Sequence, residues 1–265
     1  MTLETAPCYV TPRFSPTMAS PIVRTERLTR SFGSLMAVAQ VNFEVERGEL
    51  RSIIGPNGAG KTTFFRLISG EMAPSSGRIW FDGREITGLP QHRVSRLGVS
   101  KSYQITNVFP HLTVLENIRV AAQTYRLSFN FWGRAAALTA IRDKACVILK
   151  EVGLWDKREL LAAYLSHGEK RHLELGIALS TDPTLLLLDE PTAGMSPEET
   201  DETIHLIRRI ATGRTVILVE HKMKVVMNIS DRITVLHQGQ VLADGTPAEI
   251  RANVLVQQTY LGIAK

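Results

Sequence analysis

The densest group of residues capable of chemistry lies at positions 55–62, where the sequence reads GPNGAGKT. This segment fits the pattern Gly-x-x-x-x-Gly-Lys-Ser/Thr, in which glycines let backbone N–H groups close around phosphate oxygens. Lys61 is expected to reach the β and γ phosphates, and the hydroxyl of Thr62 to ligate Mg²⁺. A structural glycine turn would account for Gly58 and Gly60, but not for Lys61 and Thr62 behind a strand. The segment therefore predicts a site for nucleotide phosphates.

Two acidic residues follow the leucine run at positions 185–188. A continuously apolar segment is typical of a strand buried on both faces of a parallel sheet, and ligands collect at the carboxyl ends of such strands. Asp189 is suited to hold the Mg²⁺ shell through water, and Glu190 to polarise a water for attack on the γ-phosphate. Taken alone, the pair has an equally simple interpretation as two acids that end a strand.

Ser166 and Glu169 have the spacing of a capping box, which satisfies free N–H groups at the start of a helix. A helix start with a serine and a glycine in its first turn is also a good anion site. The segment therefore predicts a capped helix, and capping does not exclude ligand binding.

Three other residues carry no clear signal singly. His221 follows the apolar run TVILV, where a lone histidine is usually a partly exposed polar residue, and Gln104 and Phe32 are uninformative by themselves. The seven histidines show no His-Glu-x-x-His arrangement or other metal-binding spacing. We therefore expect no metal other than Mg²⁺ bound with a nucleotide.

The elements around these residues alternate between strand and helix. A strand at 48–54 precedes the glycine-rich segment and a helix follows it, and after residue 165 the order is helix, strand, helix, strand. Such alternation predicts an α/β fold with a mostly parallel sheet. The remaining expected elements are a small β layer at 23–45, a helical region at 113–165, a hairpin at 233–245 and a closing helix at 248–262.

Composition narrows the class of protein. The 265 residues exceed one average domain of about 150 residues, and a hydrophobic content of 44% with 22% charged residues excludes disorder for the bulk of the chain. The net charge of +5 suits an anionic ligand or a membrane surface, but it is too scattered to indicate nucleic-acid binding. No run approaches the roughly 18 apolar residues needed to cross a bilayer. Two cysteines are too few for a disulfide framework, which favours a reducing cytoplasm.

Together, these motifs resemble the nucleotide-binding subunit of ATP-binding cassette (ABC) transporters over about residues 22–262. Their order is the specific part: GPNGAGKTT at 55–63 is similar to Walker A, Gln104 to the Q-loop, LSHGEKR at 165–171 to the signature LSGGQ, LLLLDEP at 185–191 to Walker B, and His221 to the switch histidine. The resemblance implies a P-loop NTPase fold with a mixed, mostly parallel core sheet, an N-terminal antiparallel β subdomain and a helical signature subdomain at about 105–180. Residues 1–21 are expected to form a disordered tail, and 263–265 a short C-terminal one.

The resemblance also implies roles for individual residues. Two cassettes would face head to tail, each ATP lying between one Walker A loop and the partner's signature, with residues 193–195 as the D-loop that links the two sites. ATP binding is implied for Phe32, which would stack on adenine, and for Gly55, Pro56, Asn57, Gly58, Ala59, Gly60, Lys61, Thr62 and Thr63. Catalysis is implied for Glu190 as base, His221, Lys61 and Gln104; Mg²⁺ binding for Thr62, Gln104 and Asp189; and contact with the partner's ATP for the signature residues Ser166, His167, Gly168 and Glu169.

The sequence departs from the family pattern at three positions. His167 and Glu169 replace a glycine and a glutamine of LSGGQ, and Lys222 stands where relatives often show an acid after the switch histidine. These changes leave Ser166 and Gly168 in place, so hydrolysis of ATP is still expected.

Within the family, several segments look most like the ATPase subunits of bacterial branched-chain amino-acid uptake systems, with urea and short-amide systems as close relatives. The resemblance implies a second ABC ATPase as homo- or heterodimer partner, integral membrane permeases, indirectly an extracytoplasmic binding protein, and a peripheral location on the cytoplasmic face of the inner membrane. No nucleic-acid partner is expected. A groove for a permease helix is hypothesised around Phe109, Phe129, Phe131 and Trp132, although these aromatics serve equally well as subdomain core.

Two further functions remain open on the sequence. A lipopolysaccharide-type export ATPase has nearly the same motifs. Soluble ABC ATPases that act on DNA or ribosomes carry a long coiled coil or two cassettes, whereas the stretch from Thr62 to Tyr164 has no heptad run.

Overall fold

The computed structural model describes residues 20–102, 108–123 and 134–260. Its larger sheet has the strand order β10-β9-β3-β8-β7-β6. All neighbouring strands of this sheet run parallel except β9 and β10, which form an antiparallel hairpin. The strands are β3 (Leu50–Ile54), β6 (Val99–Ser102), β7 (Leu185–Asp189), β8 (Thr215–Val219), β9 (Arg232–His237) and β10 (Gln240–Gly245). The predicted α/β class with a mostly parallel sheet is confirmed.

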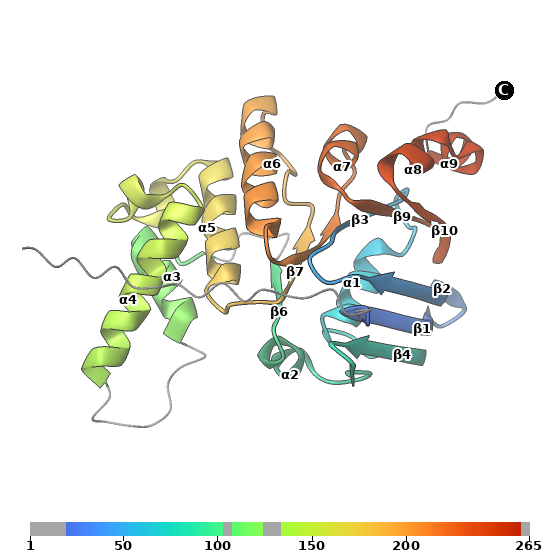
Figure 1. Cartoon of the computed structure of the whole chain (residues 1–265), viewed down its shortest axis with the longest axis horizontal. Coiled ribbons are helices and arrows are strands. Elements are labelled where there is room, and N and C mark those ends of the chain that lie inside the picture. Colours follow the sequence, from blue (N-terminus) through green and yellow to red (C-terminus); the bar gives the residue numbers. More distant parts are fainter. Residues whose placement is uncertain (1–19, 103–107, 124–133, 261–265) are drawn as a thin grey trace, which may run out of the picture.

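A second, antiparallel sheet has the order β2-β1-β4-β5. Its strands are β1 (Val23–Phe32), β2 (Leu35–Val45), β4 (Ser76–Phe81) and β5 (Arg84–Glu85). Helix α1 (Lys61–Ile68) packs in the same hydrophobic core as strands of both sheets, and the rings of Phe43 and Phe64 meet edge to face at 5.1 Å. Figure 1 shows α1 between β3 and the antiparallel sheet. The predicted β layer is confirmed, and it extends to β4 and β5, which the sequence did not indicate.

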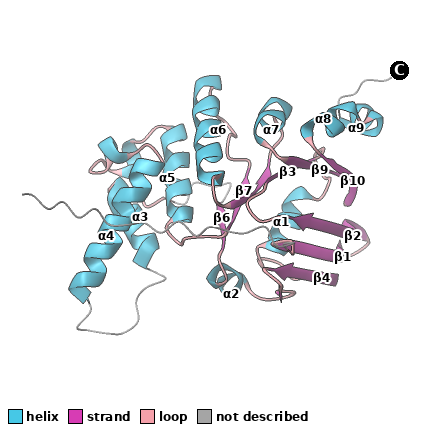
Figure 2. Cartoon of the chain, in the orientation of Figure 1, coloured by secondary structure: helices cyan, strands magenta, loops and turns pink. Residues whose placement is uncertain are grey.

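Helices cover the other face of the core sheet. Figure 2 shows α5 (His167–Leu179), α6 (Pro197–Ala211) and α7 (Met223–Ile229) along one side of the sheet, with α3 (Val114–Gln123) and α4 (Arg134–Glu151) beyond α5. The side chains of Leu186, Leu188, Val216 and Leu218 share a buried cluster with these helices. The predicted helical region after residue 113 therefore packs onto the sheet through α5. Short helices complete the fold at α2 (Gln91–Arg96), α8 (Pro247–Ala252) and α9 (Val254–Tyr260).

The closing helix expected at 248–262 is wrong as a single element, because the structure divides it into α8 and α9. Asn253 has extended angles, φ −73° and ψ 114°, and ends α8. Its side-chain oxygen accepts a hydrogen bond from the N–H of Val256 at 3.2 Å, which caps the start of α9. An asparagine satisfies helix-end N–H groups in this way at small cost, so the break is explained by local capping.

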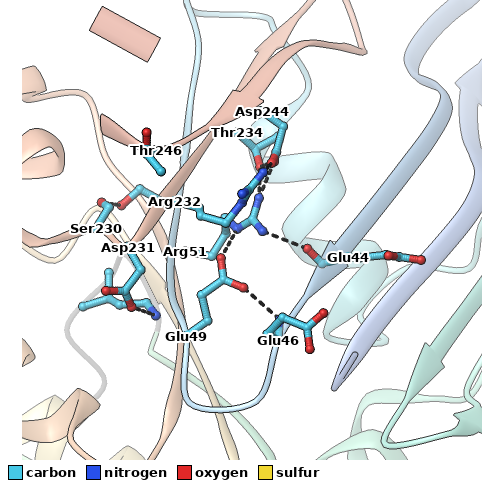
Figure 3. Close-up of polar contacts among 12 residues, drawn as sticks. Glu44, Glu46, Glu49, Arg51, Ser230, Asp231, Arg232, Thr234, Asp244 and Thr246 are labelled. Atoms are coloured by element: carbon cyan, nitrogen blue, oxygen red, sulfur yellow. Dashed lines mark hydrogen bonds and ion pairs between the residues drawn. The ribbon is translucent and has the colours of Figure 1, made fainter. Parts of the chain in front are cut away.

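A buried arginine links the two sheets (Figure 3). Arg51 on β3 is only 4% exposed, and its Nε donates to Glu49 Oε1 at 2.6 Å. Its other nitrogens donate to the carbonyl of Glu44 on β2 at 3.1 Å and to Thr234 Oγ1 on β9 at 3.1 Å, and they pair with Asp244 on β10. Because one guanidinium on β3 satisfies partners on three other strands, β2, β9 and β10, it fixes the position of the antiparallel sheet against the core sheet.

Among the residues that the structure describes, no helix combines the length and apolar content that a bilayer crossing requires.

Candidate functional site

The glycine-rich loop leads from β3 into α1, as predicted, and two of its glycines lie against neighbouring backbone. Gly60 precedes α1 in the left-handed region with φ 96°, and a Cβ there would lie 2.2 Å from the carbonyl oxygen of Ala37. A Cβ on Gly55 would lie 2.2 Å from the carbonyl oxygen of Leu236. Only glycine fits at either position, so the loop keeps its backbone close to both sheets.

The start of α1 is open to an anion. Within the described part of the chain, no side chain caps it, and its first turn carries no acidic residue. The first N–H groups of a helix have no partner within the helix, and they carry a partial positive charge. These groups are therefore available to phosphate oxygens, which is the chemistry that the sequence pattern predicted.

Lys61 lies at this helix start and is almost completely buried. Its Nζ donates to the carbonyl oxygens of Gly55 at 2.7 Å and Pro56 at 3.0 Å. Burial lowers the pKa of Lys61, while the nearby carboxylates of Glu190 and Asp189 act to raise that pKa. The lysine thus lies within electrostatic range of the two predicted acids, and carbonyl oxygens of the loop hold its ammonium group.

The two acids stand at the carboxyl end of β7, as expected. Burial raises the pKa of Asp189, whose exposed fraction is 4%, while Lys101 acts to lower this pKa and Glu190 to raise it. Glu190 has φ 48°, a left-handed conformation that is uncommon outside glycine. Its N–H donates to the carbonyl of Val219 on β8 at 2.9 Å. Such strained backbone is typical of functional sites, where surrounding structure holds it in place.

His221 follows β8 and contacts Glu190 directly. Its Nε2 forms a hydrogen bond with Glu190 Oε1, in which the histidine donates when Nε2 carries the proton. A carboxylate and an imidazole in contact can together hold and deprotonate a water. The structure therefore brings together Lys61, Asp189, Glu190 and His221, which lie far apart in the sequence.

Glu220 is a buried acid that the sequence reasoning missed. It is 2% exposed, and its carboxylate accepts from the N–H and Oγ1 of Thr192 at 3.0 and 2.6 Å and from the N–H of His221 at 3.0 Å. Lys222 donates to the carbonyl of Thr192 at 3.0 Å and to Thr200 Oγ1 at 3.1 Å. Glu220 and Lys222 thus join the segment after β8 to the segment after Glu190. The available signal for Glu220 was an acid immediately after the apolar run at 216–219.

The signature segment begins α5 with the predicted capping box. Ser166 Oγ accepts from the N–H of Glu169 at 3.2 Å, and Glu169 Oε2 accepts from the N–H of Ser166 at 2.9 Å. His167 Nε2 lies 3.1 Å from the carbonyl oxygen of Ala193, and the N–H of Gly168 donates to Glu199 at 3.2 Å. Figure 1 shows β7 between α5 and α1, so the signature and the glycine-rich loop belong to separate parts of this chain.

Of the residues predicted to stack on adenine, to form the Q-loop or to line a permease groove, the structure describes only Phe32 and Phe109. Phe32 ends β1 with an exposed fraction of 44%, and the guanidinium carbon of Arg30 lies 4.8 Å from its ring centroid. Gln104 lies outside the described residues, as do Phe129, Phe131 and Trp132. Phe109 is 54% exposed, so its ring is not part of the buried core.

The oxygen donors near the loop suit Mg²⁺. Thr62 lies exposed in the first turn of α1, and Asp189 is the last residue of β7 in the core sheet. Hydroxyl and carboxylate oxygens together with phosphate and water are the ligands that this small, hard ion prefers. The open helix start, the buried lysine and these oxygens therefore fit a nucleotide that carries Mg²⁺.

Comparisons with known proteins match this arrangement. Residues 38–193 match the family described as ABC transporter, and residues 240–264 the family described as branched-chain amino acid ATP-binding cassette transporter. The chain is 43% identical to the high-affinity branched-chain amino acid transport ATP-binding protein BraF of Pseudomonas aeruginosa, covering 93% of this chain and 100% of BraF. The corresponding protein LivG of Escherichia coli K12 is 40% identical with the same coverage. The solved ADP conformation of MJ1267, an ATP-binding cassette of an ABC transporter, is 28% identical with a TM-score of 0.81, covering 92% of this chain and 100% of that one.

Proposed function

The chain belongs to the ABC transporter family as an ATP-binding cassette, and on this premise we propose that it powers the import of branched-chain amino acids. The observation that supports this substrate class is the match of the segment beginning at β10 to the branched-chain family. That segment holds none of the residues assigned to ATP, so its likeness is independent of the ATP chemistry. It therefore favours branched-chain amino acids over urea, amides or lipopolysaccharide.

The proposed reaction is hydrolysis of ATP to ADP and phosphate at the site around α1. The loop at 55–63 binds the phosphates through backbone N–H groups, and Phe32 stacks on the adenine. Lys61 exchanges its two loop carbonyls for phosphate oxygens, which also restores a charged partner to a buried ammonium group. Thr62, Gln104 and Asp189 would hold Mg²⁺, which would neutralise charge on the phosphates when it is bound.

Glu190 and His221 act on the attacking water. The Glu190 carboxylate accepts a proton from the water, and His221, already in hydrogen-bond contact with Glu190, orients the water toward the γ-phosphate. Glu220 positions His221 by accepting its backbone N–H at 3.0 Å. The buried contacts of Glu220 thereby fix the position of His221 relative to the base Glu190.

The proposed assembly places the chain on the cytoplasmic face of the inner membrane. Two cassettes pair head to tail, and the signature of each, through Ser166, His167, Gly168 and Glu169, faces the ATP of the other. Integral membrane permeases bind the pair, and an extracytoplasmic binding protein delivers the substrate. The resemblance of the motifs and of the whole chain to transporter cassettes supports this arrangement.

The test is isolation of the protein from native membranes in mild detergent, with mass spectrometry of what copurifies. We expect permease subunits, a second cassette, and a binding protein that takes up leucine, isoleucine or valine in an equilibrium binding assay. A binding protein specific for urea would contradict the substrate class. Ribosomal or DNA-bound proteins without any membrane partner would contradict the transport role.

A further inference from the structure

The signature helix starts with its donors already in use. Gly168 is the second residue of α5, and its N–H donates to Glu199 Oε1 at 3.2 Å. The next N–H, that of Glu169, donates to Ser166 Oγ at 3.2 Å. Among the described residues, no side chain caps the start of α1, whereas here side-chain oxygens of the same chain occupy the positions that an anion would take.

Glu199 is held in this place by a second helix. It is the third residue of α6, where its N–H donates to Ser196 Oγ at 3.2 Å and its Oε2 accepts from the N–H of Ser196 at 3.1 Å. One carboxylate oxygen therefore completes the capping box of α6, and the other bonds to the signature turn. A glutamate at this position needs only the contact with the N–H of Ser196 to cap its own helix, so the contact with Gly168 is additional.

The approach between Glu199 and the signature turn is close. A Cβ on Gly168 would lie 2.9 Å from Glu199 Oε1, so the carboxylate fills the space directly beside the glycine. A phosphate oxygen bonded to the same N–H would compete for this space, and the two negative charges would repel each other. The carboxylate and an incoming phosphate cannot both occupy the Gly168 N–H.

A second link joins the same two segments. His167, one of the departures from the LSGGQ pattern, lies 3.1 Å through Nε2 from the carbonyl oxygen of Ala193. The signature turn is thus tied twice, through His167 and Gly168, to the stretch from Ala193 to Glu199. Both ties are made within one chain.

We propose that Glu199 is a positioning residue that occupies the Gly168 N–H in the nucleotide-free chain and must be displaced before a partner cassette's ATP can bind there. The proposal rests on the proposed function, because it assumes that the signature meets a γ-phosphate. Displacing the carboxylate uses part of the binding energy of ATP. Glu199 therefore sets the ATP concentration at which two cassettes close.

A groove beside Glu199 can accommodate its side chain once the carboxylate is displaced. Glu199 lines a groove of about 410 Å³ together with His172, His205 and Arg209. The same groove is lined by Ser166 and Gly168 of the signature turn and by the acids Glu169 and Glu202. The groove leaves room for the Glu199 side chain to rotate off the Gly168 N–H toward the guanidinium of Arg209, while it stays beside the signature turn.

The test compares two isosteric substitutions in the purified transporter complex. Glu199→Gln keeps a capping box, since glutamine serves at this position, but removes the negative charge. We expect the ATP concentration for half-maximal hydrolysis to fall by about three- to tenfold, the size expected for one partly exposed like charge, with kcat unchanged. Glu249→Gln is the matched control, because Glu249 makes the same capping box with Thr246 at the start of α8. It should behave as wild type.

An unchanged half-saturation in Glu199→Gln, or a raised one with lower kcat, would overturn the proposal. A separate measurement does not depend on hydrolysis: amide hydrogen exchange at Gly168 in the full, nucleotide-free chain. Exchange should be at least several-fold faster in Glu199→Ala than in Glu249→Ala, because only the first loses an acceptor at Gly168. Equal exchange contradicts the contact itself, whereas a wild-type complex that hydrolyses no ATP contradicts the proposed function.

Discussion

At the scale of single residues, Asp189 shows a conflict between stability and function. Burial raises the pKa of its carboxyl in the folded chain above the value of about 3.9 expected for an unfolded aspartate. The folded state therefore binds this proton more tightly than the unfolded state does. Stability consequently falls as pH rises through the interval between the two pKa values, and it stays lower at neutral pH. A buried charge with this cost is retained at a site that a ligand completes.

Because the ionised carboxylate of Asp189 lowers stability at neutral pH, replacing it with a neutral amide in Asp189→Asn should raise stability. At pH 7 the nucleotide-free variant should melt about 2–4 °C above wild type, which corresponds to roughly 1 kcal/mol for a chain of this size. Its ATPase activity should fall, because a carboxylate for Mg²⁺ is lost. Asp143→Asn, at an exposed position on α4, is the control and should leave the melting temperature unchanged. A lower melting temperature for Asp189→Asn than for wild type would contradict the assignment.

Glu190→Gln isolates the chemical step. The glutamine has nearly the same shape but cannot accept a proton from water, so we expect turnover to fall by about a hundredfold or more while Mg-ATP binding persists. Steady-state hydrolysis and equilibrium binding of a fluorescent ATP analogue measure the two separately. Turnover like that of wild type in the assembled complex would remove Glu190 from its role.

At the scale of elements, the Arg51 network holds the antiparallel sheet against the core sheet. Removing the guanidinium leaves Glu49, which is 8% exposed, without its ion-pair partner. We expect Arg51→Ala to lower the free energy of unfolding by about 3–5 kcal/mol, as is typical when one partner of a buried pair is removed. Urea denaturation measures this loss. Arg78→Ala, on the exposed side of β4, should change the free energy of unfolding by less than about 0.5 kcal/mol. Equal losses in both variants would show that the network does not join the sheets.

The sequence predicted those elements whose pattern is strong in itself. The strands β7 and β8 contain the apolar runs 185–188 and 216–219, and β3 ends in the apolar pair Ile53 and Ile54. The glycine-rich loop, the capping box of α5 and the hairpin of β9 and β10 all have local signatures. By contrast, β6 reads Val-Ser-Lys-Ser and becomes a strand through pairing with β7, which supplies both its hydrogen bonds and its apolar cover. Tertiary contacts decide such elements, so periodicity in one sequence cannot reveal them.

The residues of the candidate site that belong to local motifs were predictable from the sequence, whereas contacts between distant segments were not. Lys61, Asp189, Glu190 and His221 follow from motifs at the ends of apolar strands, and the structure brings them together. The contact between Gly168 and Glu199 spans 31 positions in the sequence, and the capping box at Ser196 already accounts for a glutamate at Glu199. Nothing in the local pattern points to this second contact.

At the scale of the whole molecule, one chain carries both a phosphate-binding loop and a signature turn, and in the proposed dimer these two parts belong to different ATP sites. The loop around Lys61 and the turn around Ser166 lie on different parts of the fold, with β7 between α1 and α5 (Figure 1). If each ATP is bound by a loop from one chain and a signature from another, mixing Lys61→Ala with Ser166→Ala should create mixed dimers with one intact site. Hydrolysis should then exceed that of either variant alone. No gain on mixing, with mixed dimers demonstrated by mass spectrometry, would contradict the paired arrangement.

ATP-driven uptake of labelled leucine into proteoliposomes containing the complete copurified complex tests the central claim most directly. With ATP on the side of the cassettes, we predict uptake by the wild-type complex and almost none by a complex whose cassette carries Glu190→Gln, although that variant still binds ATP. Uptake that is equal in the two complexes, or that proceeds without ATP, would contradict the assignment of this chain as the ATPase that powers transport.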